Sequence, residues 1–166
     1  MANWCSNKVE FIGERNELIV VKASFLALAR KERNEKAGQL PTFVDKRNGG
    51  YFFDLNWDGD ILYYQTKWAP NTAVLVQIAD EYRVGFNYRY EETGNGIFGE
   101  ASYLNGELTD VCLDADDTGQ YEYDEETGTY RFENQNYESS SDILETLLAR
   151  KKAVIKQQQL SSNNEQ

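Results

Sequence analysis

The spacing of hydrophobic residues near the start of the chain predicts a strand followed by a helix. Val9 and Phe11 alternate with Lys8 and Glu10, which is the pattern of a strand over residues 4–13 with one buried face. From residue 16 to about residue 33 apolar positions recur at helical spacing, so we expect an amphipathic helix there. These positions are Leu18, Val21, Phe25, Leu28 and Ala29.

The next segment predicts a hairpin, a short helix and another strand. Two alternating runs, 51–57 and 61–64, flank Asp58-Gly59-Asp60, whose residues suit a tight turn. Pro70 suits the first helical position, because its missing amide hydrogen costs nothing there. The apolar face of this helix is Val74, Leu75, Ile78, Ala79 and Tyr82. Strict alternation over 84–91 then predicts a strand.

The C-terminal half predicts two more strands, an acidic ribbon and a helix. Asn105-Gly106 forms a tight turn between strands over 97–104 and 108–113. Residues 114–133 are expected to form an acidic β-ribbon, and a last helix starts at the capping pair Ser141-Asp142. Its apolar positions are Ile143, Leu144, Leu147, Leu148, Val154 and Ile155.

The order strand, helix, hairpin, helix, strand predicts an α+β protein of the ferredoxin-like type. We expect an antiparallel sheet with two helices on one face, extra C-terminal strands and a C-terminal helix. A single domain with its appended ribbon spans 1–138, the helix spans 139–157, and the polar residues 158–166 form a disordered tail. The fold name describes topology and implies no iron.

The amino-acid composition excludes most types of enzyme active site. The sequence has no histidine, which excludes Ser-His and Cys-His nucleophiles and imidazole-based zinc sites. Cys5 and Cys112 are distant in sequence and are expected to be reduced, which fits a cytoplasmic protein. No apolar run reaches the roughly 20 residues of a membrane helix, and Met1 to Gly13 lacks the features of a signal peptide. We therefore predict a protein without catalytic residues and without a cofactor.

Charge is strongly uneven along the chain. The net charge is −11, and it comes from residues 80–145, which hold 18 acidic and 3 basic side chains. Such a surface attracts a basic protein and repels nucleic acid, so we predict a binding module with a basic protein partner, no direct nucleic-acid binding and no membrane contact. An alternative is that the carboxylates mimic a nucleic-acid duplex and inhibit a host or defence protein. The candidate partner-binding residues are Glu100, Glu107, Asp110, Asp114, Asp116, Asp117, Glu122, Asp124, Glu125 and Glu126.

A divalent metal is the other alternative, either bound alone or serving a carboxylate-dependent enzyme. The residues from Asp114 to Glu125 match the spacing of a calcium-binding EF-hand loop, although strands and not helices are predicted on both sides. The calcium ligands would be Asp114, Asp116, Thr118, Gln120 and Glu125. A second acidic cluster, Asp54 with Asp58 and Asp60, is available to a metal enzyme.

Several uncommon residue combinations resemble a known family. The start Asn3-Trp4-Cys5-Ser6-Asn7, the stretch Trp68-Ala69-Pro70, and the later Tyr88-Arg89-Tyr90-Glu91 and Phe98-Gly99 resemble the YubB-type ferredoxin-like family. The resemblance implies a ferredoxin-like fold and a setting in plasmids, phages and genomic islands, and it assigns no catalytic residue. At the strand start we expect Asn3, Trp4 and Asn7 to cap a sheet edge, with Trp4 covering the core and the two amides satisfying loop backbone. Alternatively, Asn3, Trp4, Asn7 and Trp68 form a candidate ligand patch.

The last helix ends in basic residues. Arg150, Lys151, Lys152 and Lys156 follow its apolar stripe. We expect this end to lie against the acidic strands, either of the same chain or, through self-association, of a neighbour.

Overall fold

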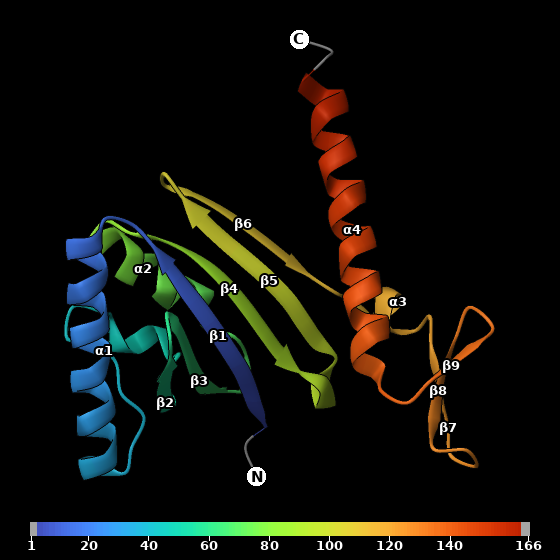
Figure 1. Ribbon diagram of the computed structural model, residues 1–166, viewed down its shortest axis with the longest axis horizontal. Coiled ribbons are helices and arrows are strands. Elements are labelled where there is room, and N and C mark those ends of the chain that lie inside the picture. Colours follow the sequence, from blue (N-terminus) through green and yellow to red (C-terminus); the bar gives the residue numbers. More distant parts are fainter. Residues whose placement is uncertain (1–2, 164–166) are drawn as a thin grey trace.

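The computed structural model describes residues 3–163, and the predicted alternation of strands and helices is present in it (Figure 1). The first half contains β1 (Trp4–Ile12), α1 (Arg15–Glu35), the 3-10 turn η1 (Lys46–Asn48), β2 (Phe53–Asp58), β3 (Ile61–Lys67), α2 (Thr72–Tyr82) and β4 (Gly85–Glu92). The second half contains η2 (Thr93–Asn95), β5 (Ile97–Leu104), β6 (Glu107–Cys112), α3 (Ala115–Thr118), β7 (Glu122–Asp124), β8 (Thr129–Phe132), β9 (Gln135–Tyr137) and α4 (Ser140–Asn163).

The first six strands form one antiparallel sheet in the order β2-β3-β1-β4-β5-β6. Its first four strands have ferredoxin-like topology, and the β5–β6 hairpin extends the sheet beyond β4. Helices α1 and α2 both cover one face, because Phe25 and Ile78 pack in the same apolar cluster as Val9 of the central strand. The predicted fold class, including two helices on one face, is confirmed.

Helix α4 lies against the opposite face at the β5–β6 end of the sheet. Successive strand residues point to opposite faces, and on β5 Ala101 packs toward α1 and α2 whereas Phe98 packs toward α4. Phe98 joins a second apolar cluster that includes Phe132 of β8 and Leu147 of α4. This cluster attaches the small sheet β7-β8-β9 and α4 to the main body.

Several element bounds differ from those predicted. Helix α2 begins at Thr72 and not at Pro70, because Asn71 occupies the N-cap position and places its side chain in the core. Strand β2 begins at Phe53, where the pairing register shifts and Asp54 adopts a left-handed φ of 52°. Strand β9 is an element that the sequence pattern does not predict.

The last helix also exceeds its predicted range. It continues through residues expected to belong to a disordered tail and ends at Asn163, since no glycine or proline interrupts it. Residues 164–166 of that predicted tail lie outside the described part. Val154, expected on the buried stripe, is 51 % exposed on the half of α4 that projects from the body.

Within residues 3–163, none of the helices has the length and apolar character required to cross a membrane.

Candidate functional site

The unusual residues near the start of the chain build a polar network inside the core. The side-chain amide of Asn7 donates hydrogen bonds to the carbonyl oxygen of Cys5 at 2.7 Å and to the hydroxyl of Thr66 at 3.0 Å, and its oxygen accepts one from Tyr88. Asn7 is only 4 % exposed. The Asn7 side chain is engaged in the core and does not lie at the surface beside Trp4 and Trp68.

The same network fixes the start of α2. The Tyr64 hydroxyl donates to the side-chain oxygen of Asn71 at 2.7 Å, and the Asn71 side-chain amide donates to the carbonyl oxygen of Gly50 at 2.9 Å. The backbone amide of Asn71 donates to the Tyr88 hydroxyl at 3.3 Å. Asn71 therefore joins β3, β4 and the loop before β2 at one buried point.

Burial also controls the thiol beside this network. Cys5 is fully buried, and desolvation raises the pKa of its thiol to about 11. Cys5 and Cys112 are both free. A thiol with so high a pKa is a poor nucleophile at neutral pH.

The motif Phe98-Gly99 has a packing explanation. Gly99 pairs with Tyr90 across β5 and β4, and a β-carbon on Gly99 would lie only 2.5 Å from the Tyr90 hydroxyl oxygen. The Tyr90 ring therefore fills the space above Gly99. This motif supports the sheet.

The other members of the predicted patch remain near the surface. The Trp68 backbone amide donates to the Asn3 carbonyl oxygen at 2.9 Å, which ties the residue before β1 to the end of β3. Trp4 is 45 % exposed and Trp68 is 54 % exposed. The patch is thus reduced to two exposed tryptophans and the Asn3 segment that connects them.

The acidic residues after β6 form a helix turn and a hairpin, not a calcium loop. The Asp114 side chain accepts hydrogen bonds from the amides of Asp116 and Asp117, and the Asp117 side chain accepts one from the Asp114 amide, which completes a capping box on α3. Thr118 directs its hydroxyl at the Asp114 carbonyl oxygen, 3.1 Å away. Gln120 and Glu125 lie beyond this turn, and Glu125 is in the β7–β8 connection.

Neither acidic cluster considered for a metal gathers its carboxylates. Asp54 lies in the irregular part of β2, whereas Asp58 is the last residue of β2 and Asp60 lies in the turn before β3. In the part of the chain from residue 3 to residue 163, no three side chains of the Asp, Glu, Cys or His type form a group suited to a metal ion. The arrangement expected for Asp114, Asp116 and Glu125 is therefore absent.

Helix α4 places consecutive basic residues against the acidic surface of its own chain. Arg150 donates to both carboxylate oxygens of Glu133, at 2.6 and 2.9 Å. Lys151 donates to Asp114 at 2.7 Å and to Asp117 at 2.5 Å. Lys152 forms an ion pair with Glu100, and Glu145 forms one with Arg89 on β4. The predicted contact between the basic end of the last helix and the acidic strands is present within the chain.

These contacts shift two carboxyl groups. The hydrogen bond from Lys151, with the Asp117 and Asp116 amides, holds the pKa of Asp114 below its ordinary value. The hydrogen bond from Arg150 lowers the pKa of Glu133 in the same way. Both groups stay ionised at neutral pH and hold α4 in place.

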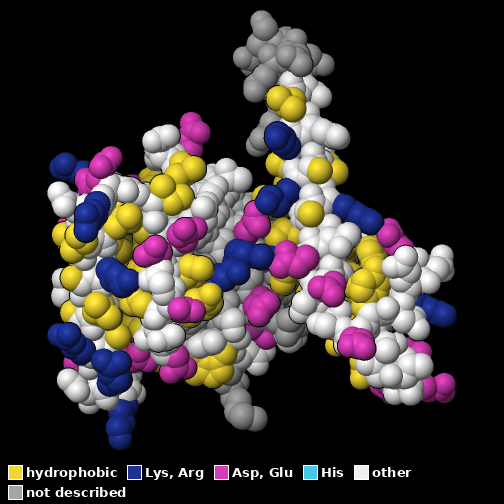
Figure 2. Space-filling model, viewed as in Figure 1, with side chains coloured by type: hydrophobic (Ala, Val, Ile, Leu, Met, Phe, Trp, Pro, Cys, Tyr) yellow, Lys and Arg dark blue, Asp and Glu magenta, His cyan; other side chains and the backbone are white. Residues whose placement is uncertain are grey.

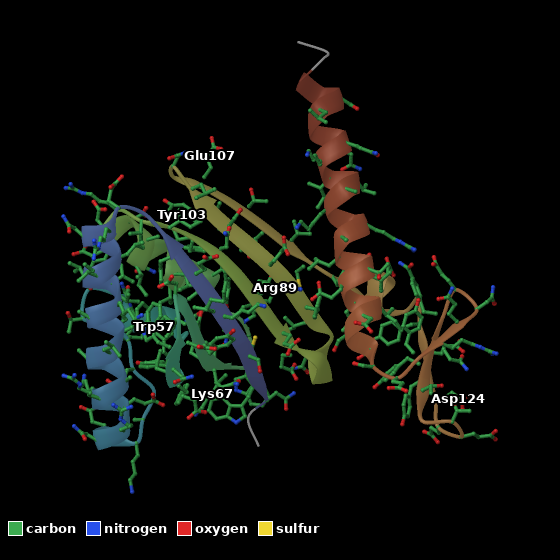
Figure 3. All side chains as sticks on the ribbon, viewed as in Figure 1. Trp57, Lys67, Arg89, Tyr103, Glu107 and Asp124 are labelled. Carbon is green, nitrogen blue, oxygen red and sulfur yellow. The ribbon has the colours of Figure 1, made fainter. Side chains whose placement is uncertain are left out.

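The ten predicted partner-binding carboxylates do not form one patch. Glu107 lies at the turn between β5 and β6, whereas Asp124 lies at the far end of the β7–β8 hairpin (Figure 3). Asp110 accepts hydrogen bonds from Tyr90 and from Thr72, so it faces α2. Glu100, Asp114 and Asp117 are engaged by α4.

The free carboxylates gather on α3 and the β7–β8 hairpin. Asp116, Glu122, Glu125 and Glu126 are exposed, and among the described residues none of them takes part in an ion pair. Asp124 accepts hydrogen bonds from the amides of Glu126 and Thr127, which shape the turn. We call α3 and β7–β8, residues 115–132, the acidic unit; Figure 2 shows acidic side chains over this region.

The sequence does not predict a groove that lies between the open sheet face and α4. It has a volume of about 480 Å³, and its charged lining consists of Lys8, Glu10, Arg89, Glu100 and Lys152. Basic and acidic side chains nearly balance there, and two of its cations are paired. Only the register of β4 on β5 and the position of α4 reveal it, since its members are far apart in sequence.

The strand order β2-β3-β1-β4, with both helices on one face, defines a ferredoxin-like α+β domain. Comparison with protein families matches residues 47–133 to the ferredoxin-like domain in Api92-like proteins, and the chain belongs to this family. The matched segment extends from η1 to the residue after β8, so it includes the acidic unit. Searches of curated proteins and of solved structures gave no match.

Proposed function

We propose that this protein is a non-enzymatic binding module that engages a basic protein partner through the acidic unit. Carboxylates on exposed β-turns attract cations at long range and accept hydrogen bonds from lysine and arginine at contact. The acidic unit presents such carboxylates at its surface, on a small sheet anchored through Phe132.

The observation that carries the proposal is the position of α4. Arg150 and Lys151 bind carboxylates that border the acidic unit or belong to it, and Lys152 binds Glu100 on β5. Helix α4 thus shows the kind of element that the acidic surface can bind, namely a helix with consecutive basic residues. Asp116, Glu122, Glu125 and Glu126 remain for a second basic element.

The family resemblance supports a proposal for the genetic and cellular setting of the protein. We propose a YubB-type protein of a mobile genetic element that acts in the cytoplasm, where a basic partner would be a host or element-encoded protein. In one form of this proposal the acidic surface mimics a nucleic-acid duplex. The partner would then bind it in a basic groove that ordinarily holds phosphates.

A binding experiment with a defined basic probe tests the proposal. Isothermal titration of a lysine-rich helical peptide against the full chain should give an affinity that falls steeply between about 0.01 M and about 1 M salt, as the screening length falls from about 30 Å to about 3 Å. The triple variant Glu122→Gln, Glu125→Gln, Glu126→Gln should lose at least about tenfold in affinity at low salt.

A matched variant separates a local surface from general charge. Glu10→Gln, Glu14→Gln and Glu81→Gln remove the same number of charges from exposed positions elsewhere, and this variant should retain most of the wild-type affinity. Equal losses in both variants, or an affinity independent of salt, would refute the proposal. Affinity capture from native cells at low salt, with both variants as baits, then identifies the physiological partner.

A further inference from the structure

A pocket of different chemistry lies away from the acidic unit, where β1 begins and β3 ends. Trp4 and Lys67 are cross-strand partners there, and Phe53 on β2 stands edge-on to Trp4 with ring centroids 5.0 Å apart. The Lys67 ammonium lies 4.9 Å from the Phe53 ring centroid and 5.6 Å from that of Trp4. Figure 3 shows Lys67 near the start of β1, away from Asp124.

The rim of this pocket is basic. Arg33 and Lys36, at the C-terminal end of α1, line it together with Lys67, and its volume is about 650 Å³. Within residues 3–163 none of these three cations takes part in an ion pair. Figure 2 shows several basic side chains on the α1 side of the molecule, in addition to those along α4.

The carboxylates of the pocket oppose this charge only partly. Glu32 accepts hydrogen bonds from the backbone amides of Asp54 at 2.6 Å and Leu55 at 3.3 Å, so its charge is directed at the irregular part of β2. Asp54 is the other acidic lining residue. Three cations therefore border two aromatic rings, with one carboxylate occupied by the backbone.

We infer that this pocket binds a nucleotide, with the base against Trp4 and Phe53 and the phosphate held by Arg33, Lys36 and Lys67. Proteins bind single-stranded nucleic acids without sequence preference by stacking the bases on aromatic side chains and by placing basic residues along the sugar-phosphate backbone. The volume lies in the range of small-molecule sites. This inference departs from the expectation of no direct nucleic-acid binding, which rests on the overall acidic charge. Repulsion by the acidic unit is screened over about 8 Å at physiological ionic strength, so the local basic residues determine the charge at this pocket.

A second aromatic and basic pair lies on the same sheet face. Tyr63, 39 % exposed, is the cross-strand partner of Lys8, four residues along β1 from Trp4 and thus about 13 Å away. Trp4 and Lys8 point to the same face because their separation is even. Glu10 and Glu91 lie on this face too, so the Trp4 pocket makes the larger contribution to binding. Tyr63 extends the path available to a single strand of nucleic acid.

Fluorescence anisotropy with two labelled probes, an oligothymidylate and a mononucleotide, tests the inference on the full chain. Trp4→Leu should weaken binding about tenfold, since stacking on one aromatic ring is worth about 1–3 kcal/mol. Three phosphate contacts predict a slope of log K against log salt of about −2, which Lys67→Gln should reduce by about 0.7. Tight binding of the oligonucleotide alone identifies a single strand as the ligand, and equal binding of both probes identifies a free nucleotide.

The chain provides a matched control for the lysine variant. Lys22 lies 5.0 Å from the ring centroid of Trp57, the same type of pair on the other side of the sheet, so Lys22→Gln should bind both probes like the wild type. Circular dichroism melting verifies that each variant is folded. The inference is refuted if neither probe binds, if Trp4→Leu and Lys67→Gln behave like Lys22→Gln, or if polyglutamate competes as well as unlabelled oligonucleotide.

Discussion

The hydroxyl of Tyr88 on β4 donates a hydrogen bond to the side-chain oxygen of Asn7 on β1, in the middle of the core. Both residues are almost fully buried. An unpaired polar group at this depth costs more than its hydrogen bond contributes, so the two residues depend on each other. The buried members of the residue combinations that resemble a family, such as Asn7 and Tyr88, are thus explained by the construction of the core.

Tyr88→Phe is expected to lower the free energy of unfolding by about 1–3 kcal/mol, because the Asn7 oxygen loses its strong donor and the Asn71 amide loses its acceptor. Urea denaturation should show a lower midpoint with an unchanged slope. Tyr63→Phe removes the same hydroxyl from an exposed position on the same sheet and should change little. Similar effects of both substitutions would contradict a special role of the buried network.

The Cys5 thiol is expected to resist alkylation at pH 8. Its pKa of about 11 leaves about one molecule in a thousand ionised, which slows the reaction by about two orders of magnitude relative to a thiol of ordinary pKa. Mass spectrometry of Cys112→Ser treated with iodoacetamide measures this rate directly. Rapid modification of the folded protein would show that Cys5 is exposed.

The same shift predicts how stability depends on pH. The folded thiol has the higher pKa, so the unfolded chain loses its proton first as pH rises. The contribution of the protonated thiol is fully present below about pH 8.5, the ordinary thiol value, and is lost as pH rises toward about 11. Cys5→Ala should show a smaller fall in stability over this range than the wild type, as measured by urea midpoints.

The two apolar clusters are expected to loosen separately. Leu147→Ala, in the α4 cluster, should cost about 2–5 kcal/mol and speed amide exchange in residues 113–160 while β1 and β4 stay protected. Ile78→Ala, in the main core, should speed exchange across the whole sheet. Indistinguishable exchange patterns would show that the molecule opens as one unit.

Lys151→Met is expected to raise the pKa of Asp114 toward its ordinary value, because the hydrogen bond from Lys151 is the main cause of its lowering. Carboxyl NMR during an acid titration measures this change. The contribution of the ionised group is present above about pH 3.9 and is lost as pH falls through the lowered pKa. Arg150→Met, which removes the partner of Glu133, should leave Asp114 unchanged.

Local patterns in the sequence predict the sheet well and the C-terminal unit less well. Tyr88 and Tyr90 alternate with polar residues, and that pattern directly reflects a strand with one buried face. Strand β9 contains Gln135, Asn136 and Tyr137, with too little apolar character to register as a strand. Its pairing with β8 comes from tertiary packing, which overrides local preference.

The candidate sites show the same division. The basic end of α4 is recognisable from its composition, whereas the individual partners Glu133 and Glu100 cannot be chosen, because they lie far away in sequence. The Trp4 pocket requires the register between β1 and β3, and it requires Arg33 to arrive from the end of α1. The sequence leaves Asn7 either as a cap of a sheet edge or as a member of a ligand patch, because its partners Thr66 and Tyr88 lie far away in sequence.

The second apolar cluster makes the six-stranded sheet depend on the C-terminal segment of the chain. Phe98 and Val111 belong to β5 and β6, and residues of α4 together with Phe132 shield them from water, so that they are only 6 % and 7 % exposed. A fragment cut after Cys112 would retain all six strands and still turn both side chains to water. Apolar side chains exposed at these two positions would favour aggregation of the fragment, so a soluble fragment of this kind would require polar replacements at Phe98 and Val111.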